Sequence, residues 1–309
     1  MPQHSSRTIA VPASRDGQRL DNFLNREMKG LPRSRVYNLI RTGQVRVNSC
    51  RAKPKQKLQS GDLVRIPPVH LNTANLVVPP DSVVQMIRES VLFNDKELLV
   101  LNKPAGLAVH GGSGLGWGLI DAARIAFAAP QLDLAHRLDR ETSGVLVLAY
   151  SLDGLNRVQQ HIQKIAANKT YLALLCGHLP TASLEVNLPL AKTAQRAGER
   201  LVQVDDINGK AAHTVFTRLE QYKNTELVEV NITTGRTHQI RVHAQALGNP
   251  VAGDSKYGDK QANKELRELG LKSLFLHAQR LDIPLANKET LPLSAPLPEN
   301  LRVLLDTLT

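Results

Sequence analysis

The chain has 309 residues, enough for one or two domains that each bury a core, and its 42% hydrophobic and 22% charged residues are ordinary for a globular protein. Its two cysteines, Cys50 and Cys176, lack metal-ligand or CxxC spacing, which argues against a disulfide framework and for a reducing compartment. No apolar run approaches the roughly 18 residues of a membrane span, and the N-terminus lacks an apolar signal segment. We therefore expect a cytoplasmic protein that does not contact a membrane.

The distribution of charge is more informative than its sum of +11. Residues 1–72 carry fourteen Lys or Arg against four Asp or Glu, a formal charge of +10, and the rest of the chain carries +1. Such a concentrated excess indicates an appended module that binds a polyanion, with nucleic acid favoured over a membrane surface. The alternative is a solvated face that only keeps the protein soluble.

Residues 17–70 have the pattern of a compact module with two short helices followed by two strands. Apolar residues at helical spacing predict a first helix that ends at Gly30 and a second that begins at a Ser34 cap and ends at Gly43. Segments 44–48 and 63–67 are predicted strands. The cations expected to follow a phosphate backbone flank the second helix or alternate along an extended segment: Arg33, Arg35, Arg41, Lys53, Lys55 and Lys57.

Residues 71–84, which include Pro79–Pro80, are expected to form a linker, and residues 85–309 a larger domain. In that domain a hairpin is predicted over 92–106 and further strands over 170–176, 213–220 and 226–234, with helices over 118–127, 152–163 and 237–248. Helices and strands mix without regular βαβ alternation, which favours an α+β fold over a doubly wound sheet.

The segment AHRLDRETSGVLVLA (135–149) places one acidic residue, Asp139, between Arg137 and Arg140, just before an apolar strand. A carboxylate held among cations stays ionised, which suits a nucleophile or base working beside a polyanion. Glu141 cannot join it in a glycosidase pair, because residues two apart in an extended chain face opposite sides. From the spacing alone, a structural ion pair with an arginine remains the alternative.

Two further segments hold candidate side chains. In TTGRTHQIRVH (233–243), Arg236 and Arg241 could pair with a carboxylate or phosphate, or could be surface arginines of an amphipathic helix. Tyr171 at the start of a strand could stack on a base or could be a half-buried strand residue. The glycine-rich run at 111–118 matches no nucleotide-binding fingerprint, and the histidines lack metal-ligand spacing, so we expect structural histidines and no metal.

Taken together, six segments resemble the pseudouridine synthase branch that modifies large-subunit ribosomal RNA and tRNA. They are LLVLNKPAG (98–106), AVHGGSG (108–114), HRLDRETSG (136–144), KTYLAL (169–174), KAAHTVF (210–216) and TGRTHQIRVH (234–243). The module at 17–70 resembles an S4 RNA-binding domain, and the two resemblances span roughly residues 15–305. They imply an S4-like domain followed by a catalytic domain with a mixed, largely antiparallel central sheet and flanking helices.

The resemblance also implies roles for individual residues. Asp139 matches the catalytic aspartate, and Arg137 matches the arginine that occupies the gap left by a flipped nucleotide. Tyr171 matches the tyrosine that stacks on the target base and is a candidate proton acceptor. Arg241 matches the cation that pairs with the aspartate, and Ile240 the aliphatic residue beneath the base.

The implied activity is the isomerisation of uridine to pseudouridine, a reaction that needs no cofactor or metal. The order and flanks of the segments are closest to members that act on 23S rRNA, free or in an assembling large subunit, and we expect a monomer. An acylal route and a glycal route are both open. Two alternatives remain: a synthase acting on tRNA or other rRNA sites, and a non-catalytic S4-type RNA-binding assembly factor.

Overall fold

The computed structural model describes residues 6–28, 31, 33–69, 78–111, 116–163, 169–193, 201–287 and 289–308, and for Arg33 the backbone alone. The chain forms two compact units: Met1–Val78 with Gly112–Trp117, and Pro79–Gly111 with Gly118–Thr309. Residues 71–77, half of the stretch expected to be a linker, and Gly30 lie outside the described residues.

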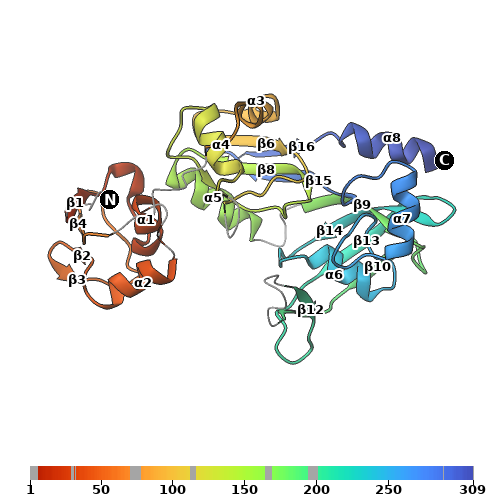
Figure 1. Cartoon of the computed structure of the whole chain (residues 1–309), viewed down its shortest axis with the longest axis horizontal. Coiled ribbons are helices and arrows are strands. Elements are labelled where there is room, and N and C mark those ends of the chain that lie inside the picture. Colours follow the sequence, from red (N-terminus) through yellow and green to blue (C-terminus); the bar gives the residue numbers. More distant parts are fainter. Residues whose placement is uncertain are drawn as a thin grey trace. The chain divides into compact units, whose positions relative to one another are not determined.

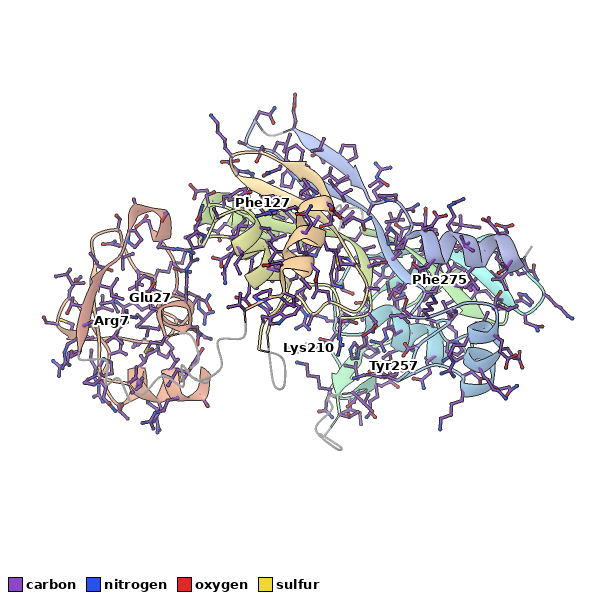
Figure 2. All side chains as sticks on the ribbon, turned by 45° about the horizontal axis from the view of Figure 1, so that its top comes forward. Arg7, Glu27, Phe127, Lys210, Tyr257 and Phe275 are labelled. Atoms are coloured by element: carbon purple, nitrogen blue, oxygen red, sulfur yellow. The ribbon has the colours of Figure 1, made fainter. Side chains whose placement is uncertain are left out.

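The first unit packs two helices, α1 (Leu20–Glu27) and α2 (Arg33–Arg41), against a small antiparallel sheet. Its strands have the order β1-β4-β2-β3 and the bounds Arg7–Ala10 (β1), Arg46–Val47 (β2), Cys50–Arg51 (β3) and Leu63–Ile66 (β4). A 3-10 turn, η1, covers Ala13–Arg15. Both predicted helices are present, but α2 already includes Ser34, which therefore does not cap it. Arg7 on β1 donates to the carbonyl of Glu27 at the end of α1 (Figure 2).

The second unit is built on a mixed sheet of ten strands in the order β10-β13-β14-β9-β15-β8-β6-β5, with β16 beside β15 and β7 beside β8. Its strands are β5 (Val91–Asn94), β6 (Leu98–Lys103), β7 (Asp133–Leu134), β8 (Ser143–Ala149), β9 (Lys169–Cys176), β10 (Ser183–Val186), β13 (Thr214–Gln221), β14 (Thr225–Ile232), β15 (Leu276–Pro284) and β16 (Thr290–Ser294). Among the pairings of described strands in this sheet, β8 with β15 is the parallel one and the others are antiparallel. The predicted α+β architecture is confirmed.

Helices flank this sheet (Figure 1). They are α3 (Asp81–Glu89), α4 (Leu119–Ala126), α5 (Leu152–Ile162), α6 (Gln239–Ala246), α7 (Lys260–Glu268) and α8 (Glu299–Leu308), and a small hairpin joins β11 (Leu190–Lys192) to β12 (Val202–Val204). Helix α5 packs against β8 and β15, whereas α6 packs against β12 and β13. The predicted hairpin, strands and helices of this unit are present. In the described part of the chain, no helix is both long and apolar enough to cross a membrane.

The centre of the sheet positions the candidate site. Strands β14, β9 and β15 are neighbours, and Tyr171 on β9 pairs with Val230 on one side and Ala278 on the other. Gly144 at the start of β8 faces Ala278 of β15 with φ of 112°. A Cβ at Gly144 would lie 2.2 Å from the Ala278 carbonyl oxygen, so the close approach of β8 and β15 requires glycine here.

Candidate active site

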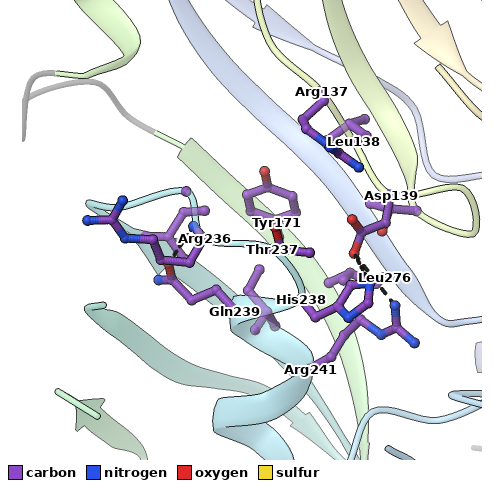
Figure 3. A pocket seen from close by; sticks show the side chains of 14 residues that line it. Arg137, Leu138, Asp139, Tyr171, Arg236, Thr237, His238, Gln239, Arg241 and Leu276 are labelled. Atoms are coloured by element: carbon purple, nitrogen blue, oxygen red, sulfur yellow. Dashed lines mark hydrogen bonds and ion pairs between the residues drawn. The ribbon is translucent and has the colours of Figure 1, made fainter. Parts of the chain in front are cut away.

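A cavity of about 100 Å³ opens between the loop before β8, strand β9 and the first turn of α6. It collects, from three separate segments, the five residues to which the resemblance assigns roles: Arg137, Asp139, Tyr171, Ile240 and Arg241. The other lining residues are Leu138, Thr142, Ile232, Gly235, Arg236, Thr237, His238, Gln239 and Leu276 (Figure 3).

Asp139 faces two donors, both from the other side of the cavity (Figure 3). Its Oδ2 atom lies 3.6 Å from Arg241 Nη1 and 3.7 Å from His238 Nε2, and its side chain is 19% exposed. The adjacent Arg140 instead donates to the Gly106 carbonyl at 2.9 Å. The cation beside the carboxylate is therefore Arg241, as the resemblance implies, and not a neighbour in sequence.

Arg241 is held by a second, buried carboxylate. Its Nε and Nη2 atoms donate to Asp254 Oδ2 and Oδ1 at 2.6 and 2.7 Å, and its guanidinium carbon lies 5.0 Å from the centre of the Tyr257 ring. Burial by itself lowers the pKa of Arg241, but the hydrogen bonds and charge of Asp254 outweigh it and raise that pKa. The bidentate pair fixes the planar fork, so that Nη1 faces Asp139 as a permanent cation.

The Asp254 carboxylate accepts hydrogen bonds from the backbone as well as from Arg241. Its Oδ1 atom accepts the backbone N–H groups of Lys256 and Tyr257 at 2.8 and 3.0 Å. Burial by itself raises the pKa of Asp254, but the hydrogen bonds and charge of Arg241 outweigh it and lower that pKa. Sequence reasoning missed this residue, because it lies in a loop without periodicity, 13 positions after Arg241.

His238 also belongs to the site, although the sequence analysis treats the histidines as structural. It immediately precedes α6, in the left-handed region with φ of 56°, and its Nδ1 atom lies 2.7 Å from the Tyr257 hydroxyl. Burial lowers the pKa of His238, while the charge of Asp139 acts in the opposite direction. The THQIR run was a usable signal for this residue, but its partner Tyr257 is 19 positions away.

Tyr171 is half-buried on β9, and its hydroxyl points away from the Asp139 carboxylate (Figure 3). Burial and the charge of Asp139 raise its pKa, so the side chain is a neutral phenol at neutral pH. The ring packs against the core cluster that contains Ile240, which is itself buried. This part of the cavity offers an aromatic face above an aliphatic floor.

The loop that carries Asp139 is tied down by a buried lysine. Lys103 Nζ donates to the carbonyls of Pro104, Arg140 and Thr142 at 2.8, 3.0 and 2.8 Å, which uses all three ammonium protons. Burial lowers the pKa of Lys103 to about 7, and the charges of Glu141 and Asp139 act against that shift. The end of β6 is thereby linked to the backbone on either side of Glu141, in the loop that carries Asp139.

Comparison with known proteins identifies the family. The model of the RNA pseudouridylate synthase family matches residues 97–246, and that of the S4 domain matches residues 18–64. The Haemophilus influenzae protein "Ribosomal large subunit pseudouridine synthase C" is 42% identical, over 98% of this chain and 95% of its own length. The chain belongs to the RNA pseudouridylate synthase family. The Escherichia coli K12 protein of the same name is also 42% identical to the synthase, over 96% of this chain and 95% of its own.

Among solved structures, the synthase resembles "Human RNA Pseudouridylate Synthase Domain Containing 4", with a TM-score of 0.61 and 29% identity. The match covers 74% of this chain and 96% of the human one. The predicted family, the S4 domain and the fold of the catalytic domain are therefore confirmed.

The candidate cations of the S4 unit whose side chains are described are exposed, but those between 53 and 57 do not lie along one extended segment. The exposed candidates are Arg35, Arg41, Lys53, Lys55 and Lys57. The expectation of one extended segment over 53–57 is wrong, because the chain turns at Pro54 and Lys55 and the Gln56 N–H donates to the Lys53 carbonyl at 3.0 Å. Pro54 has the fixed φ that favours such a turn. Across the described residues of both units, no group of three or more His, Cys, Asp or Glu could hold a metal ion.

Proposed function

We propose that the synthase converts uridines of 23S rRNA to pseudouridine in the cytoplasm, with Asp139 as the catalytic residue. The observation that carries this proposal is the Asp139 carboxylate, which lies 3.6 Å from Arg241 in a cavity that Tyr171 also lines. The relatives named as large ribosomal subunit synthases support the choice of RNA.

The reaction requires little from the protein beyond a base or nucleophile and a closed pocket. The N1–C1′ bond breaks, the uracil turns, and C5 bonds to C1′, while C5 loses a proton and N1 gains one. The product is an isomer of the substrate. Asp139 either attacks C1′, which is the acylal route, or removes the C2′ proton, which is the glycal route. Both routes need a carboxylate anion, and Arg241 places a cation 3.6 Å from it.

Arg137 and Tyr171 serve the extrusion of the target nucleotide. Flipping a base out of RNA structure costs a few kcal/mol, and stacking on an aromatic ring returns about 1–3 kcal/mol. Arg137 is exposed at the rim of the cavity and has no ion pair among the described residues, so it is available to fill the gap in the RNA stack. Ile240 supports the base from below.

Tyr171 is also our candidate for removing the C5 proton after recombination. Because its raised pKa keeps it a phenol, it can accept that proton only as its own hydroxyl proton moves on to another acceptor. Its hydroxyl has no protein hydrogen-bond partner among the described residues, so we assign the acceptor role to water.

We further propose that the S4 unit anchors a monomeric synthase on rRNA, free or in an assembling large subunit, through its exposed cations. Arg33 is included here as a proposal from sequence, with Arg35, Arg41, Lys53, Lys55 and Lys57. The two alternatives, a tRNA substrate and a non-catalytic assembly factor, are outcomes of the test below.

The test is a gene deletion followed by carbodiimide labelling of pseudouridine and mapping of reverse-transcription stops in 23S rRNA, 16S rRNA and tRNA. We expect stops in 23S rRNA to disappear and to return with the wild-type gene, but not with Asp139→Asn, which keeps the side-chain shape. Stops lost only from tRNA would overturn the rRNA assignment. Unchanged stops everywhere, or full rescue by Asp139→Asn, would overturn the enzymatic role.

A further inference from the structure

We propose that His238 is a positioning residue for the catalytic carboxylate: as a neutral imidazole whose tautomer Tyr257 sets, it holds Oδ2 of Asp139 together with Arg241 and leaves Oδ1 as the reacting oxygen. This inference rests on the proposed role of Asp139.

The hydrogen bonds of Tyr257 determine the tautomer. The Tyr257 oxygen accepts the Val202 backbone N–H at 2.9 Å, and the same oxygen lies 2.7 Å from His238 Nδ1. The phenolic proton has no other acceptor among the described residues, so it is donated to Nδ1. A neutral imidazole that accepts at Nδ1 carries its proton on Nε2. That N–H is the one that faces Asp139.

Electrostatics select the same tautomer. If Nε2 were unprotonated, its lone pair would face the Asp139 carboxylate at 3.7 Å, and two electron-rich groups would repel each other. With the proton on Nε2, the imidazole presents a positive edge to the carboxylate. The separation exceeds a hydrogen-bond length, so the contact in the free enzyme is electrostatic and can shorten when substrate closes the site.

The two oxygens of Asp139 are treated differently. Both the Arg241 and the His238 contacts go to Oδ2 (Figure 3). Oδ1 has no hydrogen-bond partner among the residues that the structure describes. An anchored oxygen is a weaker nucleophile and base than a free one, because donors stabilise its lone pairs. The geometry therefore points to Oδ1 as the atom that attacks C1′ or removes the C2′ proton.

One turn supplies both supports. Residues Gly253–Gly258 carry Asp254, which fixes Arg241, and Tyr257, which fixes His238. The imidazole is placed by a left-handed backbone conformation, with φ of 56°, that residues other than glycine rarely adopt. A strained residue aimed at the catalytic carboxylate is what a positioning role requires.

The surroundings keep His238 neutral at neutral pH. The charged or titratable groups that face it are Asp139 from the loop before β8, Arg241 from α6, and Asp254, Lys256 and Tyr257 from the turn. Burial, Arg241 and Lys256 disfavour its protonation, and the two carboxylates favour it. A second proton would have to sit on Nδ1, where the Tyr257 hydroxyl already donates, so protonation at acid pH breaks the arrangement.

The first test compares two variants of similar shape, His238→Gln and His238→Met. Gln keeps a donor near the Nε2 position, whereas Met has none. Substrate is a 23S rRNA transcript carrying tritium at uridine C5, because the reaction releases that atom to water. In single turnovers we expect His238→Met to lose about tenfold or more in rate with RNA affinity within about twofold, and His238→Gln to stay within about threefold. The wild-type rate should fall at acid pH, in part because His238 becomes protonated. The pH profile of His238→Gln should lack that part of the fall.

The second test is a double-mutant cycle with Tyr257→Phe, which removes the donor to Nδ1. Because Val202 also loses its acceptor, folding of each variant is checked by thermal unfolding. We expect Tyr257→Phe to slow the reaction in the wild-type background and to have little effect when residue 238 is Gln, which has no tautomer to set.

Equal slowing by Tyr257→Phe in both backgrounds, or a wild-type rate for His238→Met, would overturn the inference. Tritium release by the wild type, with none by Asp139→Asn, shows that the proposed function still stands in that case. If the wild type releases no tritium, the proposed function itself fails.

Discussion

The Lys103 side chain is fully buried, which lowers its pKa to about 7, and the cost of this burial is offset because each proton of its ammonium form meets a carbonyl oxygen. Two of these carbonyls, those of Arg140 and Thr142, lie 37 and 39 residues further along the chain, on either side of Glu141. The lysine thus fixes the loop immediately after Asp139. An enzyme that must place a carboxylate to within a fraction of an ångström needs such a support.

Lys103→Met is expected to destabilise the fold and slow the reaction together. Met fills a similar volume but leaves three carbonyls without their donor, which should lower the free energy of unfolding by about 3 kcal/mol. Urea unfolding and tritium release measure the two effects. The matched control is Lys260→Met at an exposed position of the same unit, expected to stay within about 0.5 kcal/mol of the wild type. Wild-type stability and rate in Lys103→Met would contradict the support role.

Some residues of the candidate site can be recognised from the sequence alone, and others cannot. Asp139 stands out in the sequence as a candidate because a carboxylate between arginines is unusual, and the resemblance pairs it with Arg241, which the structure places 3.6 Å away. His238, Asp254 and Tyr257 were not identifiable, since their roles depend on contacts between the start of α6 and a separate turn. No local pattern of charge or hydrophobicity encodes such a contact.

At the scale of elements, two neighbouring strands of the central sheet, β8 and β15, show what the sequence reveals and what it hides. Strand β8 is apolar throughout Val145–Ala149 and was expected. Strand β15, at the centre of the sheet, was missed because His277 interrupts its pattern. His277 is fully buried, and its ring nitrogens bond to Ser143 Oγ at 2.9 Å and the Ala295 carbonyl at 3.1 Å, partners that only the fold brings near.

Helix α3 was hidden by the prolines before it. The sequence predicts a linker over 71–84 that includes Pro79–Pro80, but the helix starts at Asp81 with Pro80 at its N-cap. Proline is common at the start of a helix, because the first N–H groups there have no partner within the helix. The same dipeptide can therefore end a linker and open a helix, and the sequence alone does not separate the two.

The contact between β8 and β15 yields a prediction at this scale. Gly144→Ala combines a positive φ with a clash against the Ala278 carbonyl, whereas Gly270→Ala has a similar φ of 104° and no atom within 4 Å of the new Cβ. In urea unfolding we expect Gly270→Ala to lower the free energy of unfolding by about 1–2 kcal/mol, and Gly144→Ala to lower it by about 3 kcal/mol or more. If both variants lost the same free energy of unfolding, β15 would have to move away from the new Cβ at little cost. That outcome would contradict a close contact that fixes the loop of Asp139.

For the whole molecule, the division of charge follows the division into units. The first unit has its own core, with residues such as Leu20, Leu24, Val36 and Ile40 fully buried, and it carries nearly all of the +11 net charge of the chain. The catalytic unit is nearly neutral and buries its own clusters around the ten-stranded sheet. Attraction to RNA phosphates and isomerisation of the base are thus assigned to different parts of the chain.

This assignment predicts how RNA affinity responds to salt. A cation that neutralises a phosphate releases a counterion, so each contact adds roughly 0.7–0.9 to the slope of log affinity against log salt. Replacing Lys53, Lys55 and Lys57 by Gln in the full chain should reduce that slope by about 2, with the rate at saturating RNA unchanged. Replacing Lys260, Lys264 and Lys272, which are exposed on the catalytic unit, removes the same charge and should leave the slope nearly as it was.

Removing residues 1–72 should flatten the slope further while sparing turnover on small unstructured RNA. Equal slopes for the two triple variants would show that the phosphates are held elsewhere, and that the charge of the S4 unit acts only through the long-range field.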